Sequence, residues 1–280
     1  MRELHVDRII ATVRQMCIDA NCNLNHDIEC ALKQGLNREE NSIAKSMLTD
    51  ILKNAELARS QQMPICQDTG MAVFFLELGQ DLHIIGGSLY DAINEGVRQG
   101  YIDGYLRKSV VADPVRRGNT EDNTPAIIHT RITDGDALKL TLAPKGFGSE
   151  NMSAIRMLKP SDGIDGIISF VVDTVRQAGA NPCPPLVVGV GIGGTFEYCA
   201  ELAKSALLRD VDSSNPDPYY AELETLLLEK INALDIGPQG FGGITTALGV
   251  NVEAFPTHIA GMPCAVNINC HVTRHVTEIL

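Results

Sequence analysis

Apolar positions in the first part of the chain repeat with a helical period. One stripe recurs every three or four residues and predicts a helix with a single apolar face, made by Ala44, Met47, Leu48, Ile51, Leu52, Ala55 and Ala58. Residues 1–60 are therefore expected to form a helical N-terminal arm. A loop at residues 61–70 ends this arm, and the apolar run from Met71 to Leu78 predicts a buried strand.

The rest of the chain alternates between helical and strand patterns. Helical periods predict helices at residues 88–101, 162–178, 196–208 and 218–234. Alternating or continuous apolar runs predict strands around residues 128–132, 138–142, 186–192 and 264–270. No internal repeat or low-complexity linker interrupts this order. We expect a mixed α/β (α+β-like) fold, with mixed β-sheets surrounded by helices, in a single large domain that spans residues 1–280.

The composition excludes two classes of partner. The chain has 280 residues, of which 44% are hydrophobic, enough for a substantial core. Its formal net charge of −12 argues against nucleic acid, because phosphate binding needs a basic face. No run approaches the ~20 apolar residues of a membrane span. The start, Met1–Arg8, carries acidic residues and lacks the apolar segment of a secretion signal, so the expected location is the cytoplasm.

The chain has eight cysteines and no recognisable secretion signal, so thiols or metal ligands are expected rather than disulfides. Four of them fall within predicted helices, where a cysteine is ordinarily small apolar filler: Cys17, Cys22, Cys30 and Cys199. The others lie in or beside segments with proline or glycine, where ligands and catalytic groups concentrate: Cys66, Cys183, Cys264 and Cys270.

A glycine-rich segment at the end of the strand predicted at residues 186–192 has two interpretations. Gly189, Gly191 and Gly194 match the G-x-G-x-x-G pattern of dinucleotide sites, between a predicted strand and a predicted helix. That fingerprint also needs a second strand that ends in an acidic residue ~20 residues further on, and a helix and a polar turn stand there instead. The favoured interpretation is a strand-to-helix turn whose glycines allow close backbone approach.

Three short segments each have a cysteine at their centre and are separated by long stretches of chain: Pro64–Gly70, Ala180–Pro185 and Asn267–His271. Zinc ribbons place pairs of ligands roughly two to four residues apart, so this spacing does not fit them. It does fit a metal or cluster site gathered from distant loops, and the prolines around Cys183 would stiffen one such loop. Ordinary buried thiols are the alternative.

Six short motifs occur in order along the chain. They are Cys66-Gln-Asp-Thr-Gly70, Asn119-Thr-Glu-Asp-Asn-Thr-Pro125, Lys145-Gly-Phe-Gly-Ser-Glu-Asn-Met152, Cys183-Pro-Pro185, Gly191-Ile-Gly-Gly194 and Cys270-His-Val-Thr-Arg-His275. Together they resemble the α subunit, equivalently the N-terminal domain, of class I fumarases and of the related L-tartrate dehydratases. The resemblance covers about residues 40–280.

The resemblance implies a [4Fe-4S] cluster with three cysteine ligands, carried over to Cys66, Cys183 and Cys270, and with one open iron that has no protein ligand. Cys264 is the closest rival to Cys270, but only Cys270 precedes the His-x-x-Arg of the family motif. Cys199 is a weaker rival to Cys183, since it lacks the flanking prolines. An open iron can act as a Lewis acid on the hydroxyl of a 2-hydroxy acid, and it would also make the enzyme oxygen-sensitive.

The resemblance also implies roles for residues around such a cluster. Arg107 resembles the family's carboxylate-binding arginine, and Gln67 and Gly148 fall where the family binds substrate. Asp68 could relay a proton beside the cluster. His258 matches a histidine that the family places near the substrate, where it could pair with Asp68. The alternatives are a surface arginine, a loop-forming aspartate and a structural histidine.

Class I fumarases complete their site from a C-terminal domain or β subunit that supplies further basic residues and the base. No sequence for such a domain follows Cys270, so a separate β subunit is expected, in an assembly of two α and two β subunits. The expected enzyme is a hydro-lyase that interconverts fumarate and (S)-malate in the tricarboxylic acid cycle. L-Tartrate or mesaconate-type substrates are alternatives, and a non-catalytic metal-binding scaffold subunit is an alternative of another class.

Overall fold

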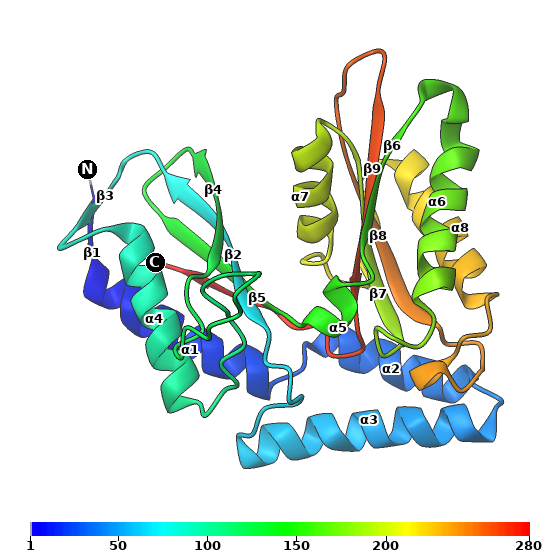
Figure 1. The fold of residues 1–280 in the computed structure, drawn as a ribbon, viewed down its shortest axis with the longest axis horizontal. Coiled ribbons are helices and arrows are strands. Elements are labelled where there is room, and N and C mark those ends of the chain that lie inside the picture. Colours follow the sequence, from blue (N-terminus) through cyan, green and yellow to red (C-terminus); the bar gives the residue numbers. More distant parts are fainter. Residues whose placement is uncertain (1) are drawn as a thin grey trace. The chain divides into compact units, whose positions relative to one another are not determined.

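The structure, a computed structural model, describes residues 2–280 and confirms the mixed α/β class (Figure 1). The chain forms two compact units, each built from segments that are far apart in sequence. Unit 1 comprises Met1–Leu24, Ala55–Phe147 and Arg274–Leu280, and unit 2 comprises Asn25–Asn54 and Gly148–Thr273. The expected helical arm at residues 1–60 is therefore divided between the two units.

Unit 1 contains a four-stranded mixed sheet with the strand order β10-β5-β2-β4. These strands are β2 (Met71–Gly79), β4 (Ile127–Thr133), β5 (Leu138–Lys145) and β10 (Val276–Ile279). β2 runs parallel to β4 and antiparallel to β5. The helices α1 (Val6–Cys22) and α4 (Leu89–Asp103) pack against each other, and α1 also packs against β5. A short parallel pair is formed by β1 (Arg2–His5) and β3 (Leu82–Ile85).

The predicted periods place the apolar side chains of unit 1 in one core. Alternate residues of β5 are fully buried, and they contact the apolar faces of α1 and α4 in a cluster that includes Leu138, Leu140, Leu142, Ile9, Val13, Ile93 and Val97. α4 begins at a serine, as helices often do: Ser88 Oγ accepts a hydrogen bond from the Asp91 backbone N–H.

Unit 2 has three layers around a sheet with the strand order β6-β9-β7-β8. The strands are β6 (Ala154–Leu158), β7 (Leu186–Gly193), β8 (Ala247–Phe255) and β9 (Met262–Asn269). One face is covered by α7 (Phe196–Ala206), and the other by α6 (Gly163–Ala178) and α8 (Pro218–Asn232) (Figure 1). α2 (His26–Arg38) lies against β8, and two single turns of 3-10 helix occur at Pro160–Asp162 and Pro238–Gly240. The remaining helices, α3 (Ser42–Gln61) and α5 (Phe147–Glu150), contain residues of both units.

The glycines of β7 let α7 pack directly on the strand's backbone. A Cβ added to Gly189 would lie 2.1 Å from the Ala203 carbonyl oxygen, and one added to Gly191 would lie 2.1 Å from that of Cys199. Neither distance leaves room for a side chain. Close backbone approach therefore accounts for the glycine-rich pattern without a nucleotide.

Several strands escaped sequence-based prediction. β8 runs parallel to β7, and no strand was predicted at residues 247–255. Leu248, Val250 and Val252 do alternate there with Gly249, Asn251 and Glu253, a strand period that was missed. The buried Asn251 donates to the carbonyls of Ala206 and Arg209. β1, β3, β6 and β10 have only four or five residues each, too few to show a period.

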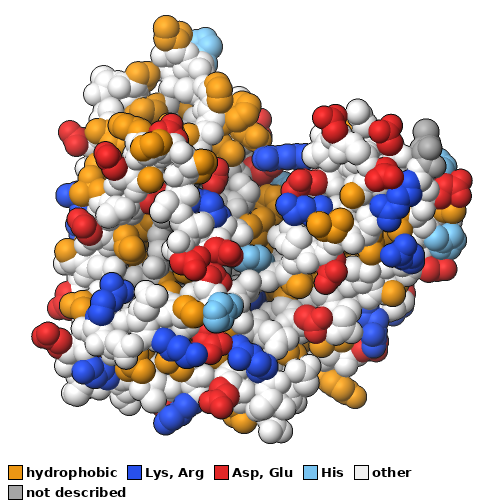
Figure 2. Space-filling view, turned by 180° about the vertical axis from the view of Figure 1, so that it is seen from behind, with side chains coloured by type: hydrophobic (Ala, Val, Ile, Leu, Met, Phe, Trp, Pro, Cys, Tyr) orange, Lys and Arg blue, Asp and Glu red, His pale blue; other side chains and the backbone are white. Residues whose placement is uncertain are grey.

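Acidic and basic side chains are interspersed over the face of the molecule that Figure 2 presents. With a net charge of −12, that face offers no continuous basic surface for nucleic acid. Within residues 2–280, no helix has both the length and the apolar character that crossing a membrane requires.

Candidate active site

The first cysteine motif forms a loop in unit 1 between α3 and β2. The side chain of Cys66 is partly exposed, and its Sγ accepts a hydrogen bond from the backbone N–H of Asp68 at 3.4 Å. The exposed Gln67 side chain is beside the same sulfur, with 3.6 Å between Sγ and Oε1. The loop thus offers the sulfur an N–H donor, which is a favourable surrounding for a thiolate ligand.

The carboxylate of Asp68 shapes this loop. Its Oδ1 accepts a hydrogen bond from the Gly70 backbone N–H at 3.1 Å, and its Oδ2 accepts one from the Phe147 N–H at 2.9 Å. The first bond is the local turn that Asp-Thr-Gly predicts, and the second comes from a distant part of the chain. Each carboxylate oxygen can accept more than one hydrogen bond, so this loop-forming role is compatible with a proton relay.

Side chains from distant segments hold the backbone carbonyls of the same loop. The guanidinium of Arg274, which is 4% exposed, donates to the Asp68 carbonyl at 2.8 Å. The hydroxyl of Tyr101, on α4, lies 2.9 Å from the carbonyl oxygen of Thr69 and 3.0 Å from that of Gly70. Gly70 has φ of 77°, in the left-handed region that favours glycine. Three consecutive carbonyls therefore have side-chain partners, which restricts the loop to one conformation.

Arg107 is attached to the Asp68 loop through its backbone. Its carbonyl accepts a hydrogen bond from Thr69 Oγ1 at 3.1 Å. Two residues on, the Ser109 N–H donates to Asn123 Oδ1 at 2.7 Å, and Asn123 Nδ2 donates to the Gly70 carbonyl at 3.1 Å. The Arg107 side chain itself is exposed, as binding a carboxylate from solvent requires. Unit 1 thus links four of the predicted site residues: Cys66, Gln67, Asp68 and Arg107.

Two of the predicted cluster ligands lie on neighbouring loops of unit 2. His271, which follows Cys270, approaches the Cys183 carbonyl oxygen with its backbone N at 3.3 Å and its Nδ1 at 2.9 Å. His271 Nδ1 also lies 3.2 Å from Gln239 Nε2. Gln239 donates to the Pro184 carbonyl from its backbone N–H at 2.8 Å and from Nε2 at 2.7 Å. These bonds fix the two cysteine-bearing loops to each other.

Gly148 and His258 lie in different parts of unit 2. Gly148 is close to the Cys183 loop, since an added Cβ would lie 3.9 Å from the Asn181 carbonyl oxygen. His258 is in the exposed connection between β8 and β9, whereas Cys270 follows the last residue of β9. The 8 residues of β9 separate them by ~26 Å at the usual rise of a strand. A substrate beside Cys270 therefore cannot contact His258 of the same chain.

The rival cysteines are buried. Cys199 and Cys264 are 0% exposed and face the apolar interior of unit 2. Burial raises the pKa of Cys264 to about 12, and it also raises the pKa of Cys199. These thiols stay protonated, whereas a metal ligand is a thiolate. Cys66 and Cys270 are partly exposed and Cys183 is exposed, so accessibility separates the predicted ligands from their rivals.

The donor set fits an iron–sulfur cluster in its chemistry, because cysteine thiolates are the ordinary ligands of such clusters. An N–H donor already faces the Cys66 sulfur, and the Cys183 and Cys270 loops are joined by hydrogen bonds. Cys66 belongs to unit 1 and the other two cysteines to unit 2. Within each unit taken alone, residues 2–280 include no group of three or more His, Cys, Asp or Glu side chains that could hold a metal ion.

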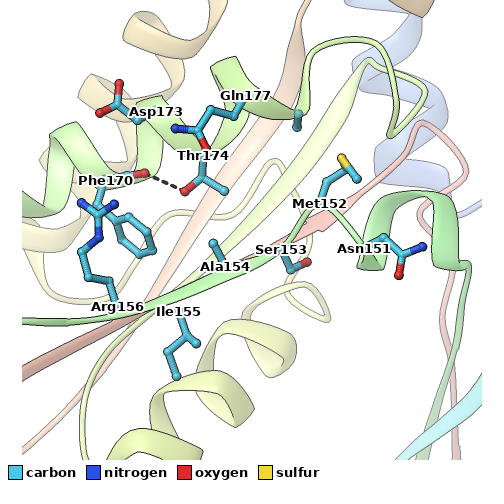
Figure 3. Close-up of a pocket in the computed structure, with 11 residues that line it drawn as sticks. Asn151, Met152, Ser153, Ala154, Ile155, Arg156, Phe170, Asp173, Thr174 and Gln177 are labelled. Atoms are coloured by element: carbon cyan, nitrogen blue, oxygen red, sulfur yellow. Dashed lines mark hydrogen bonds between the residues drawn. The ribbon is translucent and has the colours of Figure 1, made fainter. Parts of the chain in front are cut away.

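A separate cavity of about 310 Å³ lies in unit 2 between β6 and α6 (Figure 3). Arg156, from β6, stacks over the ring of Phe170 with 4.7 Å from Cζ to the ring centroid. The Thr174 hydroxyl donates to the Phe170 carbonyl at 2.7 Å on the α6 side. No predicted site residue lines this cavity, although Asn151 and Met152, the last two residues of the third motif, do.

Sequence reasoning assigned no role to three residues that hold the Asp68 loop: Tyr101, Asn123 and Arg274. Asn123 and Arg274 stand inside two of the six motifs, which was the available signal. Tyr101 is 0% exposed on the apolar face of α4, and a buried tyrosine hydroxyl needs a hydrogen-bond partner. The sequence could therefore have indicated that the Tyr101 hydroxyl has a hydrogen-bond partner, but not which residue that partner is.

The sequence as a whole matches a known protein family. The family model described as Fumarate hydratase (Fumerase) matches residues 10–278, nearly the whole chain. The chain belongs to this family, and it is a hydro-lyase subunit of a multi-subunit enzyme. The family expected from the six motifs is thereby confirmed.

Curated relatives bear a more particular name. A Methanocaldococcus jannaschii protein, provisionally named L(+)-tartrate dehydratase subunit alpha, is 40% identical over 277 residues, which cover 97% of each chain. The L(+)-tartrate dehydratase subunit alpha of Escherichia coli O157:H7 is 31% identical over 278 residues, which cover 98% of this chain and 91% of that protein. The K12 strain protein of that name gives the same values. Similarity along the full length to subunits called alpha implies a β partner.

Proposed function

We propose that this chain is the α subunit of an L(+)-tartrate dehydratase. The observation that carries the proposal is 31–40% identity, over nearly the whole chain, to proteins of that name. Fumarate was the first expectation, but the named relatives favour tartrate. In the reaction, a C–O bond and the C–H bond on the neighbouring carbon break and water leaves. The resulting enol then tautomerises to oxaloacetate.

Within this proposal, Cys66, Cys183 and Cys270 hold a [4Fe-4S] cluster that leaves one iron open. Support comes from the six motifs, from the accessibility of the three thiols and from the burial of Cys199 and Cys264. When bound, such a group supplies Lewis-acid polarisation of a substrate hydroxyl.

The remaining site residues bind the substrate and move its proton. The exposed guanidinium of Arg107 pairs with a substrate carboxylate through two parallel N–H donors. Gln67 and the backbone N–H of Gly148 donate hydrogen bonds to the substrate. Asp68 accepts a proton on a carboxylate oxygen whose position is fixed by the Gly70 and Phe147 N–H groups.

His258 is not part of this proposed site, because β9 separates it from Cys270 of the same chain. The base, further basic residues and the rest of the substrate pocket are assigned to the β subunit. The stoichiometry of two α and two β subunits and the cytoplasmic location stay predictions.

Hydration of fumarate to (S)-malate is the second candidate function. It is favoured by the description of the family model, Fumarate hydratase (Fumerase). Both candidates use a 2-hydroxydicarboxylate and the same C–O and C–H bond cleavage, so they differ in specificity and not in mechanism.

The test is an assay of the chain co-expressed with its β subunit and purified without oxygen. L(+)-Tartrate and (S)-malate would be compared at equal concentration. Oxaloacetate would be followed by coupling to NADH oxidation with malate dehydrogenase, and fumarate by its ultraviolet absorbance. We expect kcat/KM for L(+)-tartrate to exceed that for (S)-malate by at least about tenfold, which corresponds to ~1.4 kcal/mol of transition-state binding.

A preference for (S)-malate would overturn the tartrate proposal and leave the hydro-lyase assignment intact. Activity with neither substrate in a complex that carries iron and sulfide would contradict both candidate functions. Absence of iron and sulfide would contradict the proposed cofactor and favour the scaffold interpretation.

A further inference from the structure

We propose that Thr69 and Asn123 are positioning residues that set the place of Arg107 relative to Asp68. The inference rests on the proposed function, because it assigns carboxylate binding to Arg107 and proton transfer to Asp68. It goes beyond that function by naming the residues that join the two, and these residues act through backbone atoms without touching the substrate.

Thr69 makes this connection with two different groups. Its carbonyl accepts from the Tyr101 hydroxyl, which fixes it to α4, while its own hydroxyl donates to the Arg107 carbonyl at 3.1 Å. Thr69 is 2% exposed, so water does not readily replace either bond. The residue next to Asp68 thereby holds the backbone of Arg107.

Asn123 makes a second, parallel connection. It is 0% exposed, donates from Nδ2 to the Gly70 carbonyl at 3.1 Å, and accepts at Oδ1 from the Ser109 N–H at 2.7 Å. Its φ of 63° lies in the left-handed region, which asparagine tolerates better than most residues. Only a side chain with one donor and one acceptor at this length joins both backbones, and aspartate lacks the donor.

The connections matter because Arg107 has a long, exposed side chain. Within the described part of unit 1 the structure records contacts only for its carbonyl. Fixing the backbone at residue 107 and again at Ser109 lowers the conformational freedom that the guanidinium loses on binding a carboxylate. Loss of the hydrogen bond from the Thr69 hydroxyl should therefore weaken substrate binding more than it slows the chemical step.

The experiment uses the complete αβ complex with three variants. Thr69→Val removes the hydroxyl at nearly constant volume, and Thr69→Ser keeps it. Thr174→Val makes the same change at another buried threonine, in α6 of unit 2, whose hydroxyl bonds within its own helix. We expect Thr69→Val to raise KM about fivefold while kcat changes by less than about twofold, which is the effect of one lost hydrogen bond on binding. Thr69→Ser should restore the KM, and Thr174→Val should leave both parameters unchanged.

A second measurement does not depend on activity. Hydrogen–deuterium exchange of residues 105–111 should be faster in Thr69→Val than in the wild type and in Thr69→Ser, because the Arg107 carbonyl has lost its partner. Asn123→Asp should increase exchange in the same segment further, since it places a carboxylate oxygen against the Gly70 carbonyl. Hydrogen–deuterium exchange also tests whether Thr69 holds the Arg107 backbone if the variant complex assembles too poorly for kinetics.

The two proposals fail in different ways. A wild-type complex that converts no dicarboxylate sinks the proposed function, while the exchange measurement still reports on the connection. An active wild type whose KM and exchange are unchanged in Thr69→Val overturns the positioning inference. So does a loss of kcat at constant KM, because Thr69 would then serve the chemistry and not the binding of Arg107 to substrate.

Discussion

The cysteine loop of unit 1 and the paired cysteine loops of unit 2 are held in different ways. In unit 1, the loop from Cys66 to Gly70 is held by several independent side chains, namely Tyr101, Asn123, Arg274 and the carboxylate of Asp68 itself. In unit 2, the Cys183 and Cys270 loops adjoin the paired strands β7 and β9. His271 bonds the Cys183 carbonyl, and Gln239 bonds Pro184 and lies 3.2 Å from His271 Nδ1.

The difference shows where each unit tolerates change. A loop with several independent anchors keeps its conformation when one is lost, whereas two loops whose side-chain contacts meet at His271 loosen when that side chain is removed. We therefore expect the loop around Asp68 to tolerate the loss of one side-chain contact, and the loops around His271 to be more sensitive to such a loss. Substitutions that test this contrast should have effects that decrease in the order of the cysteine ligands, Asp68, His271 and Tyr101.

The largest effect should follow the loss of any proposed ligand. Cys66→Ser, Cys183→Ser and Cys270→Ser should each abolish cluster binding, because an iron would lose a thiolate. Anaerobic reconstitution followed by iron and sulfide analysis measures this, with about four irons per chain expected for the wild type.

The matched control for the ligand variants is Cys264→Ala, which removes a buried thiol six residues from Cys270. It should keep the iron and cost about 1 kcal/mol of stability. Equal iron loss from the control would contradict the ligand assignment.

The next effect concerns chemistry in unit 1. Asp68→Asn should lower kcat by about 10²–10⁴ while the iron content stays near that of the wild type, because a proton acceptor is lost but the other anchors of the loop remain. Iron analysis and steady-state kinetics on the same preparation measure both quantities. Iron loss in parallel with activity would mean that Asp68 only shapes the loop.

A smaller effect is expected at His271, where the two cysteine loops of unit 2 meet. His271→Ala should accelerate iron release to a chelator about tenfold, because the Cys183 carbonyl loses its side-chain partner. Gln239→Ala should act in the same direction and less strongly. His26→Ala, on the exposed start of α2, is the control. If His271→Ala released iron no faster than this control, the two cysteine loops would not depend on the His271 side chain.

The smallest effect should be that of Tyr101→Phe, because Arg274 and Asn123 still hold the loop. Removal of the hydroxyl should cost about 1–2 kcal/mol of unfolding free energy and leave the iron content unchanged. A drop in iron as large as that of the ligand variants would refute the redundancy of unit 1.

The same variant has a pH signature. Burial raises the pKa of Tyr101 above its ordinary value of about 10, so its stabilisation is complete below about pH 10 and is lost as the pH rises further. The melting temperature of the wild type should therefore fall more steeply above pH 10 than the melting temperature of Tyr101→Phe. Parallel pH curves for the two proteins would contradict this.

Much of the fold could be predicted because its long elements are amphipathic. The apolar faces of α3, α4, α6 and α8 and the runs of β2 and β7 show clear periods in the sequence. β8 was missed although its apolar residues alternate with Gly249, Asn251 and Glu253, and the partners of Asn251 and Glu253 are found only in the folded unit. The assembly of each compact unit from distant segments was not predicted, because no local pattern reports such contacts.

The site was predictable in part for a similar reason. The motif residues Cys66, Asp68 and Cys183 carry their signal locally, through a turn or flanking prolines. The connections from Tyr101 and Arg274 depend on tertiary contacts that bridge 31 and 206 positions of sequence, and no local pattern reports them. The distance of His258 from Cys270 follows from β9 lying between them, which the motif order alone does not show.

The bare backbone of β7 beneath α7 also has a consequence for how variants of this protein are interpreted. Gly189 and Gly191 admit no side chain, so an exhaustive substitution screen should show a band of intolerant positions there, on a strand that carries none of the proposed ligands. Such a band looks like the footprint of a bound cofactor. Here it would record only the steric fit of one helix on one strand, and a clinical or evolutionary survey that equated intolerance with catalysis would place the active site on the wrong segment of the chain.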